Sequence, residues 1–238
     1  MNSCQKKNKI TVSNMDKYYE GSKILSDINI HIDEGELVTI VGPSGSGKST
    51  IFNIITGLTK EDSGSIFVNG EISYMYQKDL LLPYKTILDN VSLPLILKGQ
   101  KKREARDIVK PYFKIFGLEN YEKNYPSDLS GGMRQRVNFL RTFICSSDII
   151  LLDEPFGALD SITKSSIQEW FIDIKKSLNS TICMITHDID EAIKLSDRIY
   201  VISSRPANIK KEFNLSSFDK NNVEEVSNLK KKIINYFI

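Results

Sequence analysis

One glycine-rich run constrains the fold of this chain more than any other segment, because of where it stands. It directly follows the apolar, strand-like residues 37–41 and reads Gly42-Pro43-Ser44-Gly45-Ser46-Gly47-Lys48-Ser49-Thr50. In this spacing the glycines let consecutive backbone N–H groups turn inward on the phosphates of a nucleotide. Lys48 then reaches the β and γ oxygens, and the Ser49 hydroxyl ligates Mg²⁺. We expect a helix over about 48–58, whose positive N-terminal dipole lies beneath the anion.

The alternative interpretation is a plain turn between a strand and a helix that binds nothing, with Lys48 and Ser49 merely solvated. Four fixed positions, with the required strand before them and helix after them, rarely coincide by chance. The sequence therefore predicts an α/β fold in which this loop cradles the phosphates of a nucleotide.

The overall charge is nearly balanced, which argues against nucleic acid as a partner. The 238 residues include 32 Lys and Arg against 30 Asp and Glu, a net charge of +2. Such a balance creates no field that would favour nucleic acid, so we expect no nucleic-acid partner. The basic runs 101–106 and 230–232 alternate with apolar residues at near-helical spacing. This favours solvated helix faces over a phosphate or lipid patch.

The cysteines and the N-terminus indicate a reducing cytosol. Cys4, Cys145 and Cys183 are odd in number, widely spaced and lack any CxxC, which disfavours a disulfide framework and a zinc site. The first nine residues are polar and basic, and no apolar segment follows them as in a signal peptide. The apolar stretches are far too short to span a bilayer, so membrane association is expected only through a partner.

Two kinds of strand pattern predict a mixed sheet architecture. Residues 28–33 alternate isoleucines with polar residues, as in a half-buried antiparallel strand. The segments 149–152, 182–185 and 199–202 are short and continuously apolar, as in strands buried on both faces of a parallel sheet. A chain of this length suits one large domain, or a core that carries one inserted subdomain.

Helical patterns fill the stretches between these strands. Residues 167–178 repeat apolar side chains at helical spacing and predict a helix that covers the sheet. Between 83 and 123 the strand signals vanish, and two helix-like segments, about 87–97 and 101–116, predict an inserted helical subdomain. The polar span 216–228 indicates a loosely attached C-terminal helix.

A second motif ends the strand at 149–152. Asp153 and Glu154 follow it directly, where the carboxyl end of a parallel strand meets a bound nucleotide. Asp153 is the expected Mg²⁺ partner, and Glu154 can hold the attacking water and accept its proton. Two surface acids at the end of a strand are the plain alternative, which the phosphate-binding loop upstream disfavours.

A third motif narrows the class of protein. The run Leu129-Ser130-Gly131-Gly132-Met133-Arg134-Gln135-Arg136 places a serine and two glycines ahead of a helix. Alone it would be a loop that leads into a helix, but its exposed N–H groups and helix dipole can form a second anion site. Here the sequence resembles the ATP-binding cassette (ABC) family, whose signature peptide has this form.

Four further positions match the family's motifs in the expected order. They are Tyr19, which matches the aromatic that stacks on adenine, Gln77 of the Q-loop, Asp160 of the D-loop, and His187, the switch histidine. Each has a plain alternative: a packed surface ring, a polar strand end, a helix N-cap or a satisfied histidine. Tyr18 could replace Tyr19 as the stacking ring.

The resemblance covers about residues 10 to 205 and implies a fold. The implied fold is an α/β P-loop NTPase: an ABC ATPase core of mixed and parallel sheet, with an antiparallel β subdomain. One ABC ATPase domain spans 1–238, with a helical subdomain over about 83–147 inserted in a RecA-like core and a helical tail over about 216–238.

The resemblance also implies a dimer and its ligands. ATP and Mg²⁺ are the cofactors, and Ser49, Gln77 and Asp153 form the metal set. Two copies pack head to tail, so that Ser130, Gly131, Gly132 and Asp160 of one complete the nucleotide site of the other. A homodimer would then have two competent sites.

The expected partners are membrane permease subunits and, through them, an extracytoplasmic solute-binding protein. The expected place is the cytoplasmic face of the cell membrane. Met133, where the signature usually has Gln, and Gly157, where the D-loop often has Ser, resemble the nitrate, sulfonate and taurine importer branch, as does the 203–206 segment. That branch includes transporters of pyrimidine-type thiamine precursors. An exporter ATPase and a soluble non-transport ABC ATPase are the alternatives.

Overall fold

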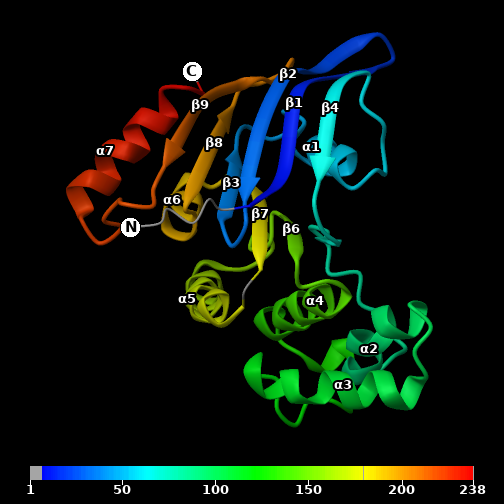
Figure 1. Ribbon diagram of the computed structural model, residues 1–238. Helices are drawn as coiled ribbons and strands as arrows, with labels where there is room; N and C mark the ends of the chain where they lie inside the picture. The colour runs from blue at the N-terminus through cyan, green and yellow to red at the C-terminus, as the bar shows by residue number, and fades with distance from the viewer. Residues whose placement is uncertain (1–6, 179, 238) are drawn as a thin grey trace, which may run out of the picture. The chain divides into compact units, whose positions relative to one another are not determined.

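The computed structural model describes residues 7–178 and 180–237, and the described chain divides into two compact units (Figure 1). The first combines residues up to Gly70 with those from Ser180 onward, and the second begins at Glu71. The α/β class expected from the sequence is confirmed, because parallel strands, an antiparallel sheet and helices are all present.

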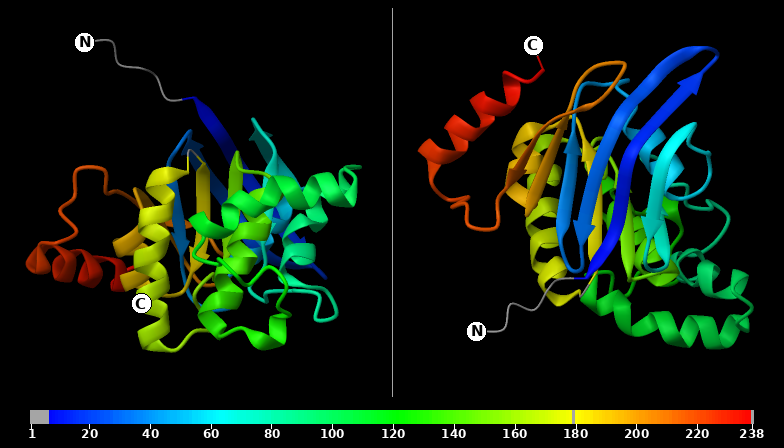
Figure 2. Two further views of the ribbon diagram at one scale, coloured as in Figure 1. Left: turned by 90° about the horizontal axis from the view of Figure 1, so that it is seen from below. Right: turned by 45° about the horizontal axis from the view of Figure 1, so that its top comes forward.

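The first unit contains an antiparallel sheet with the strand order β2-β1-β4. Its strands are β1 (Asn8–Tyr19), β2 (Ser22–Asp33) and β4 (Ser63–Val68), which lie side by side in blue and cyan in Figure 2. The predicted alternation at 28–33 is confirmed, since the isoleucines are buried and the residues between them are more exposed. A period of two places them on one face of the strand.

The same unit contains parallel strands in the order β7-β3-β8, with β9 antiparallel at the edge. They are β3 (Leu37–Val41), β7 (Thr181–Thr186), β8 (Arg198–Ile202) and β9 (Ile209–Asn214). Every residue of β3, β7 and β8 is buried, as the continuous apolar runs predict.

Helix α1 (Lys48–Ile55) follows β3 and ends earlier than the expected residue 58. Gly57 has φ of +74°, a left-handed conformation that a helix does not continue through. Helix α6 (Ile189–Leu195) joins β7 to β8.

The expectation of a loosely attached C-terminal helix is wrong. Helix α7 (Val223–Ile234) buries Leu229 and Ile233 in a cluster with residues of α6, β3 and β8. It lies beside β9 in both figures, drawn in red next to orange. The polar composition of 216–228 describes the loop and the exposed face, whereas the apolar anchors follow at helical spacing.

The second unit combines two paired parallel strands with helices. They are β5 (Ile72–Met75), β6 (Ile149–Asp153), α2 (Ile87–Leu97), α3 (Lys102–Ile115), the short 3₁₀ turn η1 (Pro126–Asp128), α4 (Gly131–Cys145) and α5 (Ser161–Ser177). The predicted helices at 87–97 and 101–116 are confirmed within one residue. Most residues of 101–106 are exposed, which agrees with a solvated helix face.

An aromatic cluster joins the helices of this unit. Phe139 of α4 lies 5.1 Å from Phe171 and 5.7 Å from Trp170 of α5, measured between ring centroids. Phe156, which follows the acidic end of β6, packs against Phe139 and Phe171. Large aromatic contacts of this kind stabilise the unit and fix the position of the loop after β6.

The structure can be compared with the sequence-based predictions about disulfides and membrane spans. Cys145 and Cys183 are free thiols, and burial raises the pKa of the Cys183 thiol above its usual range. Cys4 lies outside the described residues. In the part of the chain that the structure describes, none of the helices is both long and apolar enough to cross a membrane.

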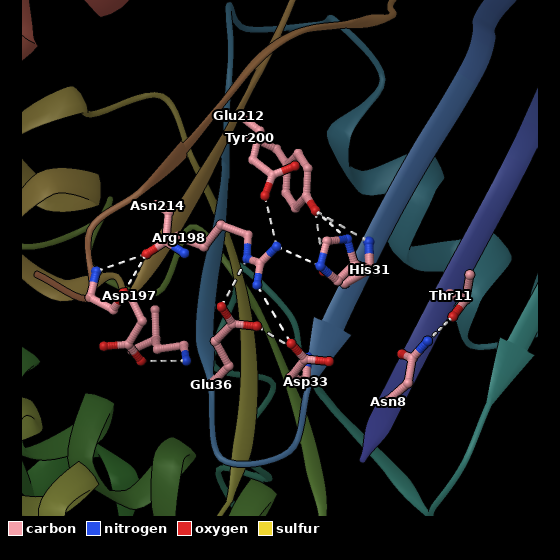
Figure 3. A network of polar contacts seen from close by, with 12 residues as sticks. Asn8, Thr11, His31, Asp33, Glu36, Asp197, Arg198, Tyr200, Glu212 and Asn214 are labelled. Atoms are coloured by element: carbon pink, nitrogen blue, oxygen red, sulfur yellow. Dashed lines mark hydrogen bonds and ion pairs between the residues drawn. The ribbon is translucent and has the colours of Figure 1, made fainter. Parts of the chain in front are cut away.

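A buried arginine ties together four strands or strand ends of the first unit (Figure 3). Arg198 of β8 bonds Glu36 at 2.8 Å and Glu212 of β9 at 2.7 Å, and its Nη2 lies 3.6 Å from Asp33. Its Nη1 also contacts Nε2 of His31 on β2. Since the guanidinium is a donor only, that nitrogen is the acceptor in this contact.

We expect Arg198→Met to lower the free energy of unfolding by about 3–5 kcal/mol, because Glu36 then stays buried without its partner. Denaturant unfolding of the full chain measures the loss. The control is Lys230→Met, which breaks the exposed pair with Asp190 and should cost less than about 1 kcal/mol. Equal losses in the two variants would show that the Arg198 network does not stabilise the unit.

Candidate functional site

The glycine-rich loop leaves the carboxyl end of β3 and returns as α1, as the sequence predicts. Gly42 lies so close to β8 that a Cβ built there would be 2.5 Å from Ile202 Cγ1. Gly47, the N-cap of α1, has φ of +111° and would place a Cβ 2.9 Å from Leu25 Cδ2. Both positions therefore require glycine, one for close packing and one also for its backbone angle.

The interior of this loop fits an anion. The ammonium group of Lys48 donates to the carbonyl oxygens of Gly42 and Pro43, each at 2.9 Å, which holds it over the loop. The Ser46 hydroxyl is buried and has no hydrogen-bond partner among the described residues. A buried hydroxyl of this kind is satisfied when phosphate oxygens enter. Ser44, Gly45 and Ser49 are exposed and Thr50 is half-buried.

His187, predicted to be the switch histidine, lies at the same sheet edge as this loop. Val41, the last residue of β3, pairs with Thr186, the last residue of β7. Gly42 and His187 therefore leave neighbouring parallel strands side by side. Asp188 accepts from the backbone N–H of Glu191 and caps α6, which fixes where the chain turns after His187.

Two exposed tyrosine rings at the end of β1 are candidates for stacking on adenine. Tyr18 and Tyr19, at the end of β1, are exposed to 43% and 44%. Each carries a lysine over its ring: Lys23 Nζ lies 5.5 Å from the Tyr18 centroid and Lys17 Nζ 5.3 Å from that of Tyr19. Both rings are available for stacking.

In the second unit the two acids stand at the end of β6. Asp153 is nearly buried, and its Oδ2 accepts a 3.0 Å hydrogen bond from the Tyr74 hydroxyl on β5. Burial and the adjacent carboxylate raise the pKa of Tyr74 well above its usual range, so that it remains a neutral donor. Sequence reasoning missed Tyr74, because its partner lies on another strand.

Gln77 and Glu154 meet directly. Met75 pairs with Leu152, so the residues after β5 and β6 leave the same edge, and Gln77 Nε2 donates to Glu154 Oε2 at 3.1 Å. Glu154 has φ of +44°, a conformation that costs a non-glycine residue about 1–3 kcal/mol.

Residues of the signature peptide and the D-loop cap two helices of this unit. The Ser130 hydroxyl accepts from Met133 N at 3.3 Å at the start of α4. Asp160 accepts from Ile162 N and Thr163 N at the start of α5, and its hydrogen bonds with Thr163 lower the pKa of its carboxyl. Both caps therefore fix the residue at which each helix begins.

A pocket of about 580 Å³ joins the Q-loop, the start of α4 and the loop after β6. Its lining residues are Gln77, Lys78, Asp79, Gly131, Arg134, Gln135, Gly157, Ala158 and Leu159. Gln135 Nε2 also donates to the carbonyl oxygen of Pro155, next to Glu154. The second unit thus brings the Q-loop, the start of the signature helix and the acidic loop together.

The expected metal set is chemically suited to Mg²⁺. Ser49 supplies a hydroxyl, Asp153 a carboxylate and Gln77 an amide oxygen, and Mg²⁺ takes oxygen ligands. When bound, the ion would neutralise charge on the phosphate groups of the nucleotide.

Together, the phosphate-binding loop, the paired acids and the helix-capping signature define an ATP-binding cassette. A family profile described as "ABC transporter" matches residues 25–157, more than half of the chain. The chain therefore belongs to the ABC transporter family. Its activity is that of the family's ATP-binding domain, which binds and hydrolyses ATP.

Individual relatives agree with this assignment. The chain is 46% identical over 191 residues to the formylaminopyrimidine import ATP-binding protein ThiZ of Halalkalibacterium halodurans, an alignment that covers 79% of this chain and 77% of that protein. It is 36% identical to the aliphatic sulfonates import ATP-binding protein SsuB of Bacillus cereus, covering 96% and 95%. The dimeric structure of MJ0796, a bacterial ABC transporter cassette, has a TM-score of 0.73 and 33% identity, covering 87% and 98%.

Gly132 and Gly131 differ in the space around them, which gives a test of local packing. A Cβ at Gly132 would lie 2.9 Å from Thr163 Cγ2, whereas one at Gly131 would lie 3.6 Å from Leu159 Cδ2. We expect Gly132→Ala to destabilise the chain by about 1–3 kcal/mol and Gly131→Ala to be nearly neutral. Denaturant unfolding compares the two.

Thr163→Ser provides the matched rescue, since it removes Cγ2 and keeps the hydroxyl. Added to Gly132→Ala, it should restore most of the lost stability. A failure of this rescue would contradict the packing account of Gly132.

Proposed function

We propose that this chain is the ATP-hydrolysing, energy-coupling subunit of an importer of a small solute. The observation that carries the proposal is the contact between Gln77 and Glu154 at the acidic end of β6. It joins Gln77, which we propose senses the permease, to Glu154, which we propose activates the attacking water. A domain that only binds nucleotide needs neither.

Each side chain has a proposed part in the reaction. Lys48 and the N–H groups of its loop bind and orient the ATP phosphates. Ser49, Asp153 and Gln77 would hold Mg²⁺. Glu154 positions the attacking water in line with the γ-phosphate and accepts its proton. His187 assists hydrolysis from the sheet edge that it shares with the phosphate-binding loop.

The complete site is proposed to need two copies of the chain packed head to tail. Ser130, Gly131 and Gly132 at the start of α4, with Asp160, would cap the ATP held by the partner copy, since helix N-termini bind anions. ATP then holds the dimer together and hydrolysis releases it. We propose one cassette domain over 1–238, with the helical subdomain over about 83–147 as the part that transmits this motion to the permease.

The solute is proposed to be small: an aliphatic sulfonate or taurine, nitrate, or a pyrimidine-type precursor. The relatives reported above differ in solute, one being named for formylaminopyrimidine and one for aliphatic sulfonates. Selectivity is therefore assigned to a permease and an extracytoplasmic solute-binding protein. The chain would work at the cytoplasmic face of the cell membrane through that permease.

Glu154→Gln should abolish ATP turnover while ATP binding is preserved, because the amide cannot accept the water's proton but keeps an oxygen for Gln77 Nε2. ATP should then trap a dimer, which size-exclusion chromatography with and without ATP detects. Lys48→Ala is the contrasting variant, expected to lose ATP affinity. Normal turnover by Glu154→Gln would remove Glu154 as the base.

The importer role is tested in the native membrane. The tagged chain, purified from gently solubilised membranes of its own host, should bring down a multi-span permease that mass spectrometry identifies. A lipid-anchored solute-binding protein in the same eluate would exclude the exporter alternative. Soluble partners alone would overturn the transport role and favour a non-transport ATPase.

A further inference from the structure

Side chains of two helices, α4 and α2, form hydrogen bonds with the main chain of the Q-loop, the segment between β5 and α2. Between β5 and α2 the main chain has no regular structure, and Leu80 within it has φ of +48°. An irregular segment with a left-handed residue keeps one conformation only when its surroundings impose it. The hydrogen bonds of this segment show which groups do so.

Arg141 of α4 forms one side of this restraint. Its guanidinium donates to the carbonyl oxygen of Leu80 at 2.8 Å and to that of Asp79, and a further bond at 2.9 Å to Asn138 Oδ1 fixes the group on its own helix. The fork of donors lets one side chain hold two consecutive peptide groups, which a lysine cannot reproduce.

Asn90 of α2 forms the other side. It is fully buried, its Oδ1 accepts from Leu82 N at 2.7 Å, and its Nδ2 donates to the carbonyl oxygens of Leu82, Lys85 and Thr86. The end of the loop next to α2 is therefore fixed independently. Arg141 restrains the part nearer Gln77.

We propose that Arg141 is a positioning residue for ATP hydrolysis, which holds the Q-loop main chain so that Gln77 meets Glu154. Gln77 precedes the first clamped carbonyl by two residues, and Arg141 lies on the helix that begins with the signature glycines. A movement of α4 is thereby transmitted to the Glu154 carboxylate through the two peptide groups that Arg141 bonds. The inference rests on the proposed roles of Gln77 and Glu154.

A double-mutant cycle tests the proposal, using the full chain in four forms: unaltered, Arg141→Met, Gln77→Ala and both together. Arg141→Met should lower kcat for ATP about tenfold with little change in KM, within the ~100-fold that a misplacement of 1 Å can cause. In the Gln77→Ala background the same substitution should change kcat little, because its effect passes through Gln77.

Two readouts separate positioning from a general loss of fold. Amide hydrogen exchange of residues 78–82 should accelerate in Arg141→Met, while the fluorescence of Trp170, the one tryptophan of the sequence, should stay unchanged. Arg103→Met, which removes an exposed arginine of α3, is the charge control and should leave kcat and exchange as they were. If Arg141→Met does not fold, Arg141→Lys replaces it, with a smaller loss expected.

An equal loss of kcat with and without Gln77 would overturn the proposal, as would unaltered kcat and exchange in Arg141→Met. If Gln77→Ala alone has the kcat of the unaltered chain, the proposed role of Gln77 fails instead. The exchange of residues 78–82 then decides by itself whether Arg141 clamps the loop.

Discussion

Parallel strand pairing is the constraint on which the rest of this structure depends. Val41 is opposite Thr186 in one unit and Met75 is opposite Leu152 in the other, so the segments that carry Gly42, His187, Gln77 and Glu154 each begin at the carboxyl end of a parallel strand. The first pairing sets Gly42 beside His187, and the second sets Gln77 beside Glu154. The strand pairing thereby fixes which functional segments share a sheet edge.

Two arginines then hold segments whose positions strand pairing alone does not determine. Arg198 joins β8 to β9, to the start of β3 and to the antiparallel sheet through carboxylates and His31. Arg141 instead holds main-chain carbonyls of the Q-loop. Both use charge-assisted hydrogen bonds, and those of Arg198 lie in buried surroundings, where an unpaired partner is costly. The first serves stability, and the second is proposed to serve catalysis.

Local sequence patterns were enough to predict much of the fold. The phosphate-binding loop, the buried strands and the helices at 87–97 and 101–116 all follow from spacing and periodicity, and the family assignment is confirmed. Contacts between distant segments could not be read in this way: the bond from Tyr74 to Asp153, the clamp of Arg141 and the packing of α7 join residues far apart in sequence. The roles of the individual site residues remain predictions.

The central claim is that a complete ATP site combines the phosphate-binding loop of one copy with the signature peptide of another. Subunit complementation tests it most directly, with Lys48→Ala and a second variant in which Ser130 is replaced by the bulky Phe. Each alone should be inactive, whereas their mixture should hydrolyse ATP in single-turnover assays, because mixed dimers contain one intact Lys48–Ser130 site. A mixture as inactive as its components would contradict the shared site.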